Sequence, residues 1–254
     1  DKVNQDMKTA TMTFILLLVS SLLQAQNPLN RVWDKRYGGT SHDYVYSVHR
    51  TSDGGFLLGG DSFSGMNGDK TQPNWSTSGS SCDYWIVKVD SLGNKEWDKR
   101  FGGTSYDDLL SFQQTTDGGF ILGGYSCCLM DGDKSQPNWG GNDYWIVKTN
   151  SLGIKLWDKR FGGTWDDKLN AIQQTTDHGY ILGGFSSSDS TGDKTQPCWK
   201  DTVLYHDSIS GNDTMYIYRT NDYWIVKTDS LGIKQWDKRS EEHTSELQSP
   251  YVIS

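Results

Sequence analysis

A four-residue string, Trp-Asp-Lys-Arg, occurs four times and divides the chain into similar segments. It begins at Trp33, Trp97, Trp157 and Trp236, at intervals of 64, 60 and 79 residues. Each interval keeps one order of motifs with small variations: "GGT", a strand-like run, "TTDGG", "FILGG", a polar loop with "GDK", then "DYWIVK" and "SLG". The third interval is longer because it contains an insertion, residues 200–220. Such self-similarity predicts a stack of supersecondary units that bury apolar surface against one another.

Each repeat predicts four antiparallel strands. In the second repeat the first three are residues 109–115, 120–126 and 143–149, and the fourth follows "NSLG". An Asp-Gly pair between the first two apolar runs is a hairpin signal. The second and third strands are apolar on both faces, so each sheet needs a neighbour above and below it.

The expected fold is therefore all-β. Four strands per repeat indicate a β-propeller fragment of three four-stranded antiparallel blades plus one strand, the segment at Trp33, preceded by a signal peptide. The blades are expected near residues 40–100, 104–160 and 164–239. A linear β-solenoid is the alternative architecture.

The two ends of the chain differ from the repeats. Residues 1–6 read as upstream read-through before Met7, and residues 7–25 predict a signal peptide, whose ten-residue apolar core is too short to span a bilayer. Residues 240–254 resemble the translation of a short-read sequencing adapter, so residues 26–239 are interpreted as part of a longer propeller. The expected location is secreted or cell-surface, without membrane insertion after signal cleavage.

Charge and cysteine spacing exclude several functions. The chain has 24 basic and 32 acidic residues, a net charge of −8, which argues against nucleic acid as a partner. Cys82, Cys127, Cys128 and Cys198 occupy unmatched places in the repeats and form no Cys-x-x-Cys pair, so we interpret them as incidental, with at most one disulfide between loops. The histidines keep no metal-ligand spacing, and no nucleophile elbow or phosphate loop occurs. We therefore expect no metal, no cofactor and no catalytic residue.

The stretch "DSLGNKEW" resembles the tryptophan-docking motif of quinoprotein dehydrogenase propellers, in which a tryptophan wedges one blade against the next. This resemblance implies that Trp97, Trp157 and Trp236 dock neighbouring blades, and that Trp33 does so from the other edge. Glycine pairs inside the second strands, such as Gly123-Gly124, indicate that a neighbouring indole approaches the backbone closely.

The long loops are the expected binding surface. In an up-and-down blade the short "TTDGG" and "SLG" turns share one face, and the long "GDK" and "GGT" loops share the other. The candidate ligand-binding residues recur in the "GDK" loops: Trp75, Trp139, Trp199, Asp69, Asp133 and Asp193. The tryptophans either stack on sugar rings or a partner protein, or pack over their own blade edge. The aspartates either help to bind calcium, a secondary candidate ligand, or cap turns.

One further acid recurs in the "GGT" loops, at Asp43, Asp107 and Asp167. Carboxylates side by side are the arrangement of a glycosidase site. A residue present in every repeat more often serves a need common to every repeat, so turn capping is the favoured interpretation.

The combination of "TTDGGFILGGYS", "DYWIVKTNSLG" and "WDKRFGGT" resembles the repeats of secreted β-propeller proteins of Bacteroidota, many of which end in a type IX secretion sorting domain. The resemblance covers residues 33–239 and implies export and a non-catalytic role. The first hypothesis is a scaffold whose long loops bind extracellular glycan or protein. The second is part of a propeller enzyme, a quinoprotein-like dehydrogenase or a polysaccharide lyase or hydrolase, with the third repeat (His178, Trp165 and residues 200–220) as the place for a site. The third is a structural stalk without a ligand.

Overall fold

The computed structural model describes residues 32–76, 79–127, 130–206 and 213–239. All regular structure in these residues is β-strand, so the all-β prediction is confirmed. In the same residues no helix is long and apolar enough to cross a membrane. The chain divides into two compact units, Asp1–Lys35 and Arg36–Ser254, and every strand belongs to the second unit. The expected signal peptide and the adapter-like residues 240–254 lie outside the described residues.

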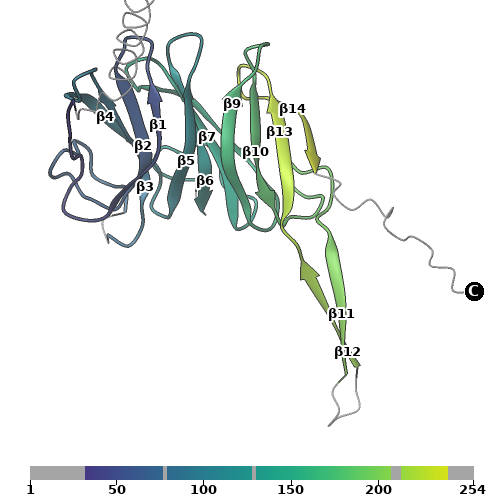
Figure 1. Ribbon diagram of the computed structural model, residues 1–254. Helices are drawn as coiled ribbons and strands as arrows, with labels where there is room; N and C mark the ends of the chain where they lie inside the picture. The colour runs from purple at the N-terminus through teal and green to yellow at the C-terminus, as the bar shows by residue number, and fades with distance from the viewer. Residues whose placement is uncertain (1–31, 77–78, 128–129, 207–212, 240–254) are drawn as a thin grey trace, which may run out of the picture. The chain divides into compact units, whose positions relative to one another are not determined.

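Twelve of the strands form three four-stranded antiparallel sheets, one for each repeat (Figure 1). The first sheet contains β1 (Asp43–Arg50), β2 (Phe56–Ser62), β3 (Asp83–Val89) and β4 (Lys95–Phe101). The second contains β5 (Asp107–Gln114), β6 (Phe120–Cys127), β7 (Asn142–Thr149) and β8 (Lys155–Phe161). The third contains β9 (Asp167–Gln174), β10 (Tyr180–Ser186), β13 (Asp222–Thr228) and β14 (Lys234–Arg239).

The insertion of the third repeat forms a separate antiparallel hairpin. Its strands are β11 (Lys200–His206) and β12 (Asp213–Arg219), which pair with each other as a two-stranded sheet (Figure 1). The hairpin leaves the pairing of β10 with β13 intact, with seven residues in continuous register. The third repeat therefore keeps the four-stranded plan despite its greater length.

The first and second strands of each sheet are joined by the expected tight turns. Gly54 and Gly118 occupy the left-handed region there, with φ of 87° and 80°. His178 stands at the same position of the third repeat and adopts φ of 63°, although it has a side chain. Left-handed backbone costs a non-glycine residue roughly 1 kcal/mol or more, so the surrounding repeat imposes this turn on His178.

The first Trp-Asp-Lys-Arg segment differs from the prediction of one extra strand. Residues 32–42 belong to no sheet in the structure. An outer strand needs a third strand to pair with, and in the three sheets that edge is already taken by β4, β8 and β14. Trp33 itself belongs to the first unit and is 38% exposed.

Adjacent sheets pack through the first strand of the following sheet. β5 lies against β2 and β3, and β9 lies against β6 and β7. Phe112 and Leu109 on β5 fill the space at Gly59, where a Cβ atom would lie 2.6 Å and 3.1 Å from them. The next junction repeats this packing with Leu169 and Ile172 at Gly123. These glycines therefore accommodate a phenylalanine and aliphatic side chains, rather than the indole that the sequence analysis expected.

A tyrosine hydroxyl links each sheet to the next. Tyr84 Oη donates to the carbonyl of Trp145 at 3.0 Å, and Tyr144 Oη donates to the carbonyl of Trp224 at 2.9 Å. Both tyrosines are 0% exposed, whereas Tyr223, at the same position of the third sheet, is 66% exposed. Tyr223 differs because it faces no further sheet within the described residues.

The two tryptophans of each repeat that lie on strands make different contacts. Trp85, Trp145 and Trp224 on the third strands are buried, and their Nε1 atoms donate to the aspartate of the following Trp-Asp-Lys-Arg string: Asp98, Asp158 and Asp237, at 3.1, 3.0 and 3.1 Å. The tryptophans of that string lie between sheets. Trp97 packs edge-on against Phe120, and Trp157 against Tyr180, with ring centroids 6.1 and 5.9 Å apart. Trp236 is 42% exposed.

The tyrosine link can be tested with a matched pair of variants. We expect Tyr144→Phe to lower the free energy of unfolding by about 1–2 kcal/mol, because it leaves the buried carbonyl of Trp224 without its donor. Tyr223→Phe should change it by less than about 0.5 kcal/mol, because that side chain is exposed. Urea denaturation of both variants measures the difference. Equal effects of the two substitutions would contradict the assignment.

Candidate functional site

Both long loops of each repeat meet at one end of the sheets, as the sequence analysis expected. The backbone N–H groups of Trp75 and Trp139 donate to Asp83 and Asp143 at the start of the third strands, at 2.9 and 2.7 Å. The "GDK" loop of the second repeat also reaches the "GGT" loop, where the N–H of Asp133 donates to the carbonyl of Gly102 at 2.8 Å. We call this end the long-loop face.

Two of the predicted ligand-binding residues contact each other across a sheet junction. Trp75 Nε1 donates to Asp133 Oδ2 at 2.9 Å, and the same oxygen accepts from Arg100 at 3.0 Å and from the N–H of Gly102 at 3.2 Å. The Arg100 guanidinium lies 4.7 Å from the centroid of Trp75. We call this set of residues a clasp, because it ties the loop of one repeat to the loop of the next.

The second junction carries the same clasp. Trp139 Nε1 and Arg160 donate to Asp193 at 3.2 and 2.8 Å, and the Arg160 guanidinium lies 4.9 Å from the centroid of Trp139. In the third repeat Arg239 lies 4.7 Å from the centroid of Trp199. Trp75 and Trp139 therefore help to hold neighbouring repeats together through the aspartate of the next loop, a contact that was not among the roles considered for them.

The loop tryptophans nevertheless remain accessible. Trp75, Trp139 and Trp199 are 41%, 53% and 43% exposed. In each case a guanidinium lies over the ring, and at Trp75 and Trp139 the indole edge is fixed by a carboxylate. A ring fixed in this way loses little conformational entropy on binding a ligand.

The aspartates of these loops do not form a calcium site in this arrangement. Asp133 and Asp193 each bind an arginine, an indole N–H and a backbone N–H. A guanidinium already neutralises each carboxylate, whereas Ca²⁺ requires several free oxygen ligands. Asp69 accepts a hydrogen bond from the N–H of Gly38 at 3.1 Å, which is the backbone part of the same arrangement.

The acids of the "GGT" loops cap those loops. Asp43, Asp107 and Asp167 accept from the N–H groups of Gly39, Gly103 and Gly163 at 2.8, 2.7 and 2.7 Å. Burial raises the pKa of Asp107 to about 7. Asp143, at the start of β7, is also fully buried, and burial raises its pKa to about 7. One oxygen of Asp143 accepts from Trp139, and the other has no hydrogen-bond partner within the described residues.

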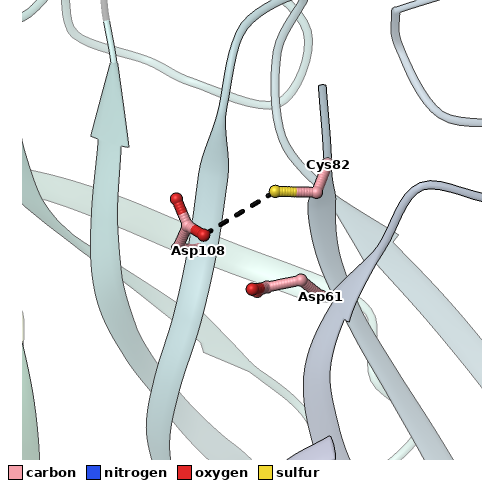
Figure 2. A group of neighbouring side chains, drawn as sticks. All are labelled: Asp61, Cys82 and Asp108. Atoms are coloured by element: carbon pink, nitrogen blue, oxygen red, sulfur yellow. Dashed lines mark hydrogen bonds between the residues drawn. The ribbon is translucent and has the colours of Figure 1, made fainter. Parts of the chain in front are cut away.

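A second cluster, which does not repeat, lies at the junction of the first two sheets. Asp61 is the penultimate residue of β2, Cys82 directly precedes β3, and Asp108 lies on β5 of the second sheet (Figure 2). One ligand atom from each side chain lies within 4.8 Å of the others. Cys82 Sγ donates to Asp108 Oδ1 at 3.7 Å, and the N–H of Leu109 donates to Asp61 at 2.7 Å. We call these three residues the Asp-Cys-Asp cluster.

Burial and charge combine in the Asp-Cys-Asp cluster. Asp61 and Cys82 are each 1% exposed. Burial, followed by the charge of Asp108, raises the pKa of Asp61, and burial also raises the pKa of Asp108. Burial and the two carboxylates raise the pKa of the Cys82 thiol. The cluster therefore holds protons that isolated carboxylates would release near neutral pH.

The sequence analysis missed the Asp-Cys-Asp cluster and treated Cys82 as incidental. The signal was present as departures from the repeat. Asp61 stands where the other repeats have Tyr125 and Phe185, and Cys82 stands where they have Asn142 and Asn221. Cys82 and Cys198 are free thiols, and Cys127 is disulfide-bonded.

The residues suggested for an enzymatic site in the third repeat do not come together. His178 lies in the turn after β9, where its Nδ1 is 3.2 Å from Thr116 Oγ1. Trp165 precedes β9, and its N–H donates to Ser188 at 2.9 Å. The eight residues of β9 place the two ends about 26 Å apart at about 3.3 Å per residue. They therefore cannot act on one small reacting group.

The sequence matches no protein-family model, and no curated protein matches it. The long-loop face and the Asp-Cys-Asp cluster are therefore the features of the chain that indicate a function.

The buried Asp143 predicts a pH dependence of stability. Because its folded pKa is raised above the usual aspartate value of 3.8, the folded state binds this proton more tightly than the unfolded state. Its contribution is therefore present below about pH 4 and is lost as pH rises through about 7, by at most about 1.4 kcal/mol per pH unit. We expect Asp143→Asn, which keeps an oxygen for Trp139, to reduce the loss of unfolding free energy between pH 4 and 8.

Asp158 supplies the opposite control for this measurement. Its pKa is lowered by Lys155, the N–H of Ser135 and the indole of Trp145, which together outweigh its burial. Its contribution is lost as pH falls, so Asp158→Asn should reduce the loss of stability below pH 4. Urea titrations across this range measure both, and matching profiles for the two variants would refute the assignment.

Proposed function

We propose that this chain is a secreted or cell-surface β-propeller repeat scaffold without catalytic activity, and that it binds glycan through the long-loop face. Consecutive sheets that pack through their first strands support a propeller arrangement. At the opposite end, the N–H groups of Ser52 and Thr116 donate to Gln114 and Gln174 of the next first strand, at 2.8 and 2.9 Å. The first strands thus line one side of the stack, as the inner strands of propeller blades do. The extracellular location depends on the signal peptide predicted at residues 7–25.

The observation that carries the proposal is the repeated loop tryptophan, fixed but half-exposed. A pyranose ring presents apolar C–H faces, which gain free energy when they cover an aromatic face. The clasp fixes the indole before the ligand arrives, so less entropy is lost on binding.

Repetition favours glycan over protein as the ligand. Trp75, Trp139 and Trp199 occupy equivalent places in successive repeats, and each is paired with its own arginine. Such a row offers the same subsite several times. A polysaccharide offers the same sugar several times, so its affinity increases through multivalency without new contacts.

Removal of a loop tryptophan tests the proposal. We expect Trp139→Ala to weaken binding to a neutral polysaccharide by about tenfold, which corresponds to about 1.4 kcal/mol for one aromatic platform. Affinity electrophoresis of the purified chain in gels with soluble neutral polysaccharides measures the change. Retardation by none of the polysaccharides would overturn the glycan assignment.

Two control variants distinguish contact of the indole ring with the glycan from stabilisation of the loop by the clasp. Trp165→Ala removes an indole that is 48% exposed and lies outside the clasps, so it should leave retardation unchanged. Asp193→Asn weakens the clasp but keeps the ring, so it should cost less affinity than Trp139→Ala. If Asp193→Asn and Trp139→Ala weaken binding equally, the tryptophan only holds the loop in place and does not contact the glycan, which would contradict the proposal.

A further inference from the structure

The Asp-Cys-Asp cluster occupies positions at which the repeats otherwise carry no metal ligand. Asp61 aligns with a tyrosine and a phenylalanine, Cys82 with two asparagines, and Asp108 with Tyr44 and Lys168. All three departures occur at the one junction between the first and second sheets. Independent drift would scatter such changes over the repeats, whereas a local function would concentrate them.

The three side chains point toward one another from three separate segments (Figure 2). The distance from Cys82 Sγ to Asp108 Oδ1 is 3.7 Å. A tetrahedral zinc ion, bound at about 2.3 Å by sulfur and about 2.0 Å by oxygen, separates these two donors by about 3.5 Å. The spacing of this pair is therefore close to that of two ligands on one ion, and the ligand atom of Asp61 lies within 4.8 Å of both.

The charges around the cluster also favour a cation. Asp61 and Asp108 are neighbouring carboxyl groups in a largely buried place, where two negative charges would repel each other with little screening unless a proton or a cation lies between them. The phenols of Tyr46 and Tyr125 hydrogen-bond to them, and Tyr46 is 51% exposed, so solvent reaches the edge of the site. Lys168 lies over the ring of Tyr125, with its Nζ 4.5 Å from the ring centroid.

We propose that Asp61, Cys82 and Asp108 bind a zinc ion that ties the first sheet to the second. One thiolate and two carboxylates suit zinc, because calcium and magnesium use oxygen ligands alone. A water molecule completes the tetrahedron from the side of Tyr46. Binding displaces the thiol proton of Cys82 and the proton held by the carboxylates, so it releases protons to the buffer. The site is independent of the long-loop tryptophans and of their proposed glycan.

Cobalt(II) provides a direct test, because it takes the same geometry and its bond to a thiolate absorbs in the near ultraviolet. Titration of the chelator-treated full chain with cobalt chloride should produce this band and saturate at one equivalent, and zinc chloride should then remove it. Zinc should also raise the Tm by at least about 2 °C. Absence of the band would overturn the proposal.

The chain contains a matched control cysteine. Cys198 is also a buried free thiol that donates to a carboxylate, that of Asp189 at 3.6 Å. Within the described residues it has no second carboxylate to complete a site. Cys198→Ser should therefore keep the cobalt band, and Cys82→Ser should lose it. A band that survives Cys82→Ser, or disappears with Cys198→Ser, would place the metal elsewhere.

Asp61→Asn guards against simple unfolding of the cysteine variant. Its amide oxygen can still accept from the N–H of Leu109, so the backbone contact between the sheets is kept. We expect native near-ultraviolet circular dichroism, cobalt affinity at least about tenfold weaker, and no rise of the Tm with zinc. Unchanged affinity in this variant would remove Asp61 from the site and contradict the proposal.

Discussion

The apolar character of both faces of each sheet is the constraint on which the rest of the structure depends. All seven residues of β3 are buried, as are seven of the eight in β7. A sheet of this kind needs cover on both sides, and the third sheet, which faces no further sheet within the described residues, leaves Tyr223 66% exposed. Glycines in the second strands admit the next first strand, and the tyrosine links then set the sheets in register. The stacking brings successive long loops together and so produces the clasps.

Much of this architecture could be predicted from periodicity alone. The predicted strands 120–126 and 143–149 lie within one residue of β6 and β7, because an Asp-Gly turn and a polar loop mark their ends. The side-chain contacts between strands and between adjacent sheets could not be predicted. The resemblance to the docking motif pointed to the tryptophan of Trp-Asp-Lys-Arg. The aspartate of that string instead accepts a hydrogen bond from a fully buried indole, as Asp158 does from Trp145. That bond joins neighbouring strands of one sheet, and their register depends on a bulge that repetition does not reveal.

The candidate sites also depend on contacts between repeats that the sequence does not reveal. Trp75 and Asp133 were both selected as ligand residues because they recur, yet they are 58 residues apart and belong to different repeats. Alignment of the repeats placed each in its own loop and hid their contact. The Asp-Cys-Asp cluster could not be predicted for the opposite reason. Its three residues do not recur, and comparison of the repeats selects only residues that do.

A repeat frame also explains why such a cluster is tolerated. The first junction is held by the hydroxyl of Tyr84, by the packing of Trp97 against Phe120 and, at the long-loop face, by Trp75. These contacts are independent of one another, so together they can offset the unfavourable free energy of burying two carboxylates beside a thiol. Positions 61, 82 and 108 could therefore diverge without loss of the stack. A metal ion bound by these three side chains would neutralise the two carboxylates and add a fourth contact between the sheets.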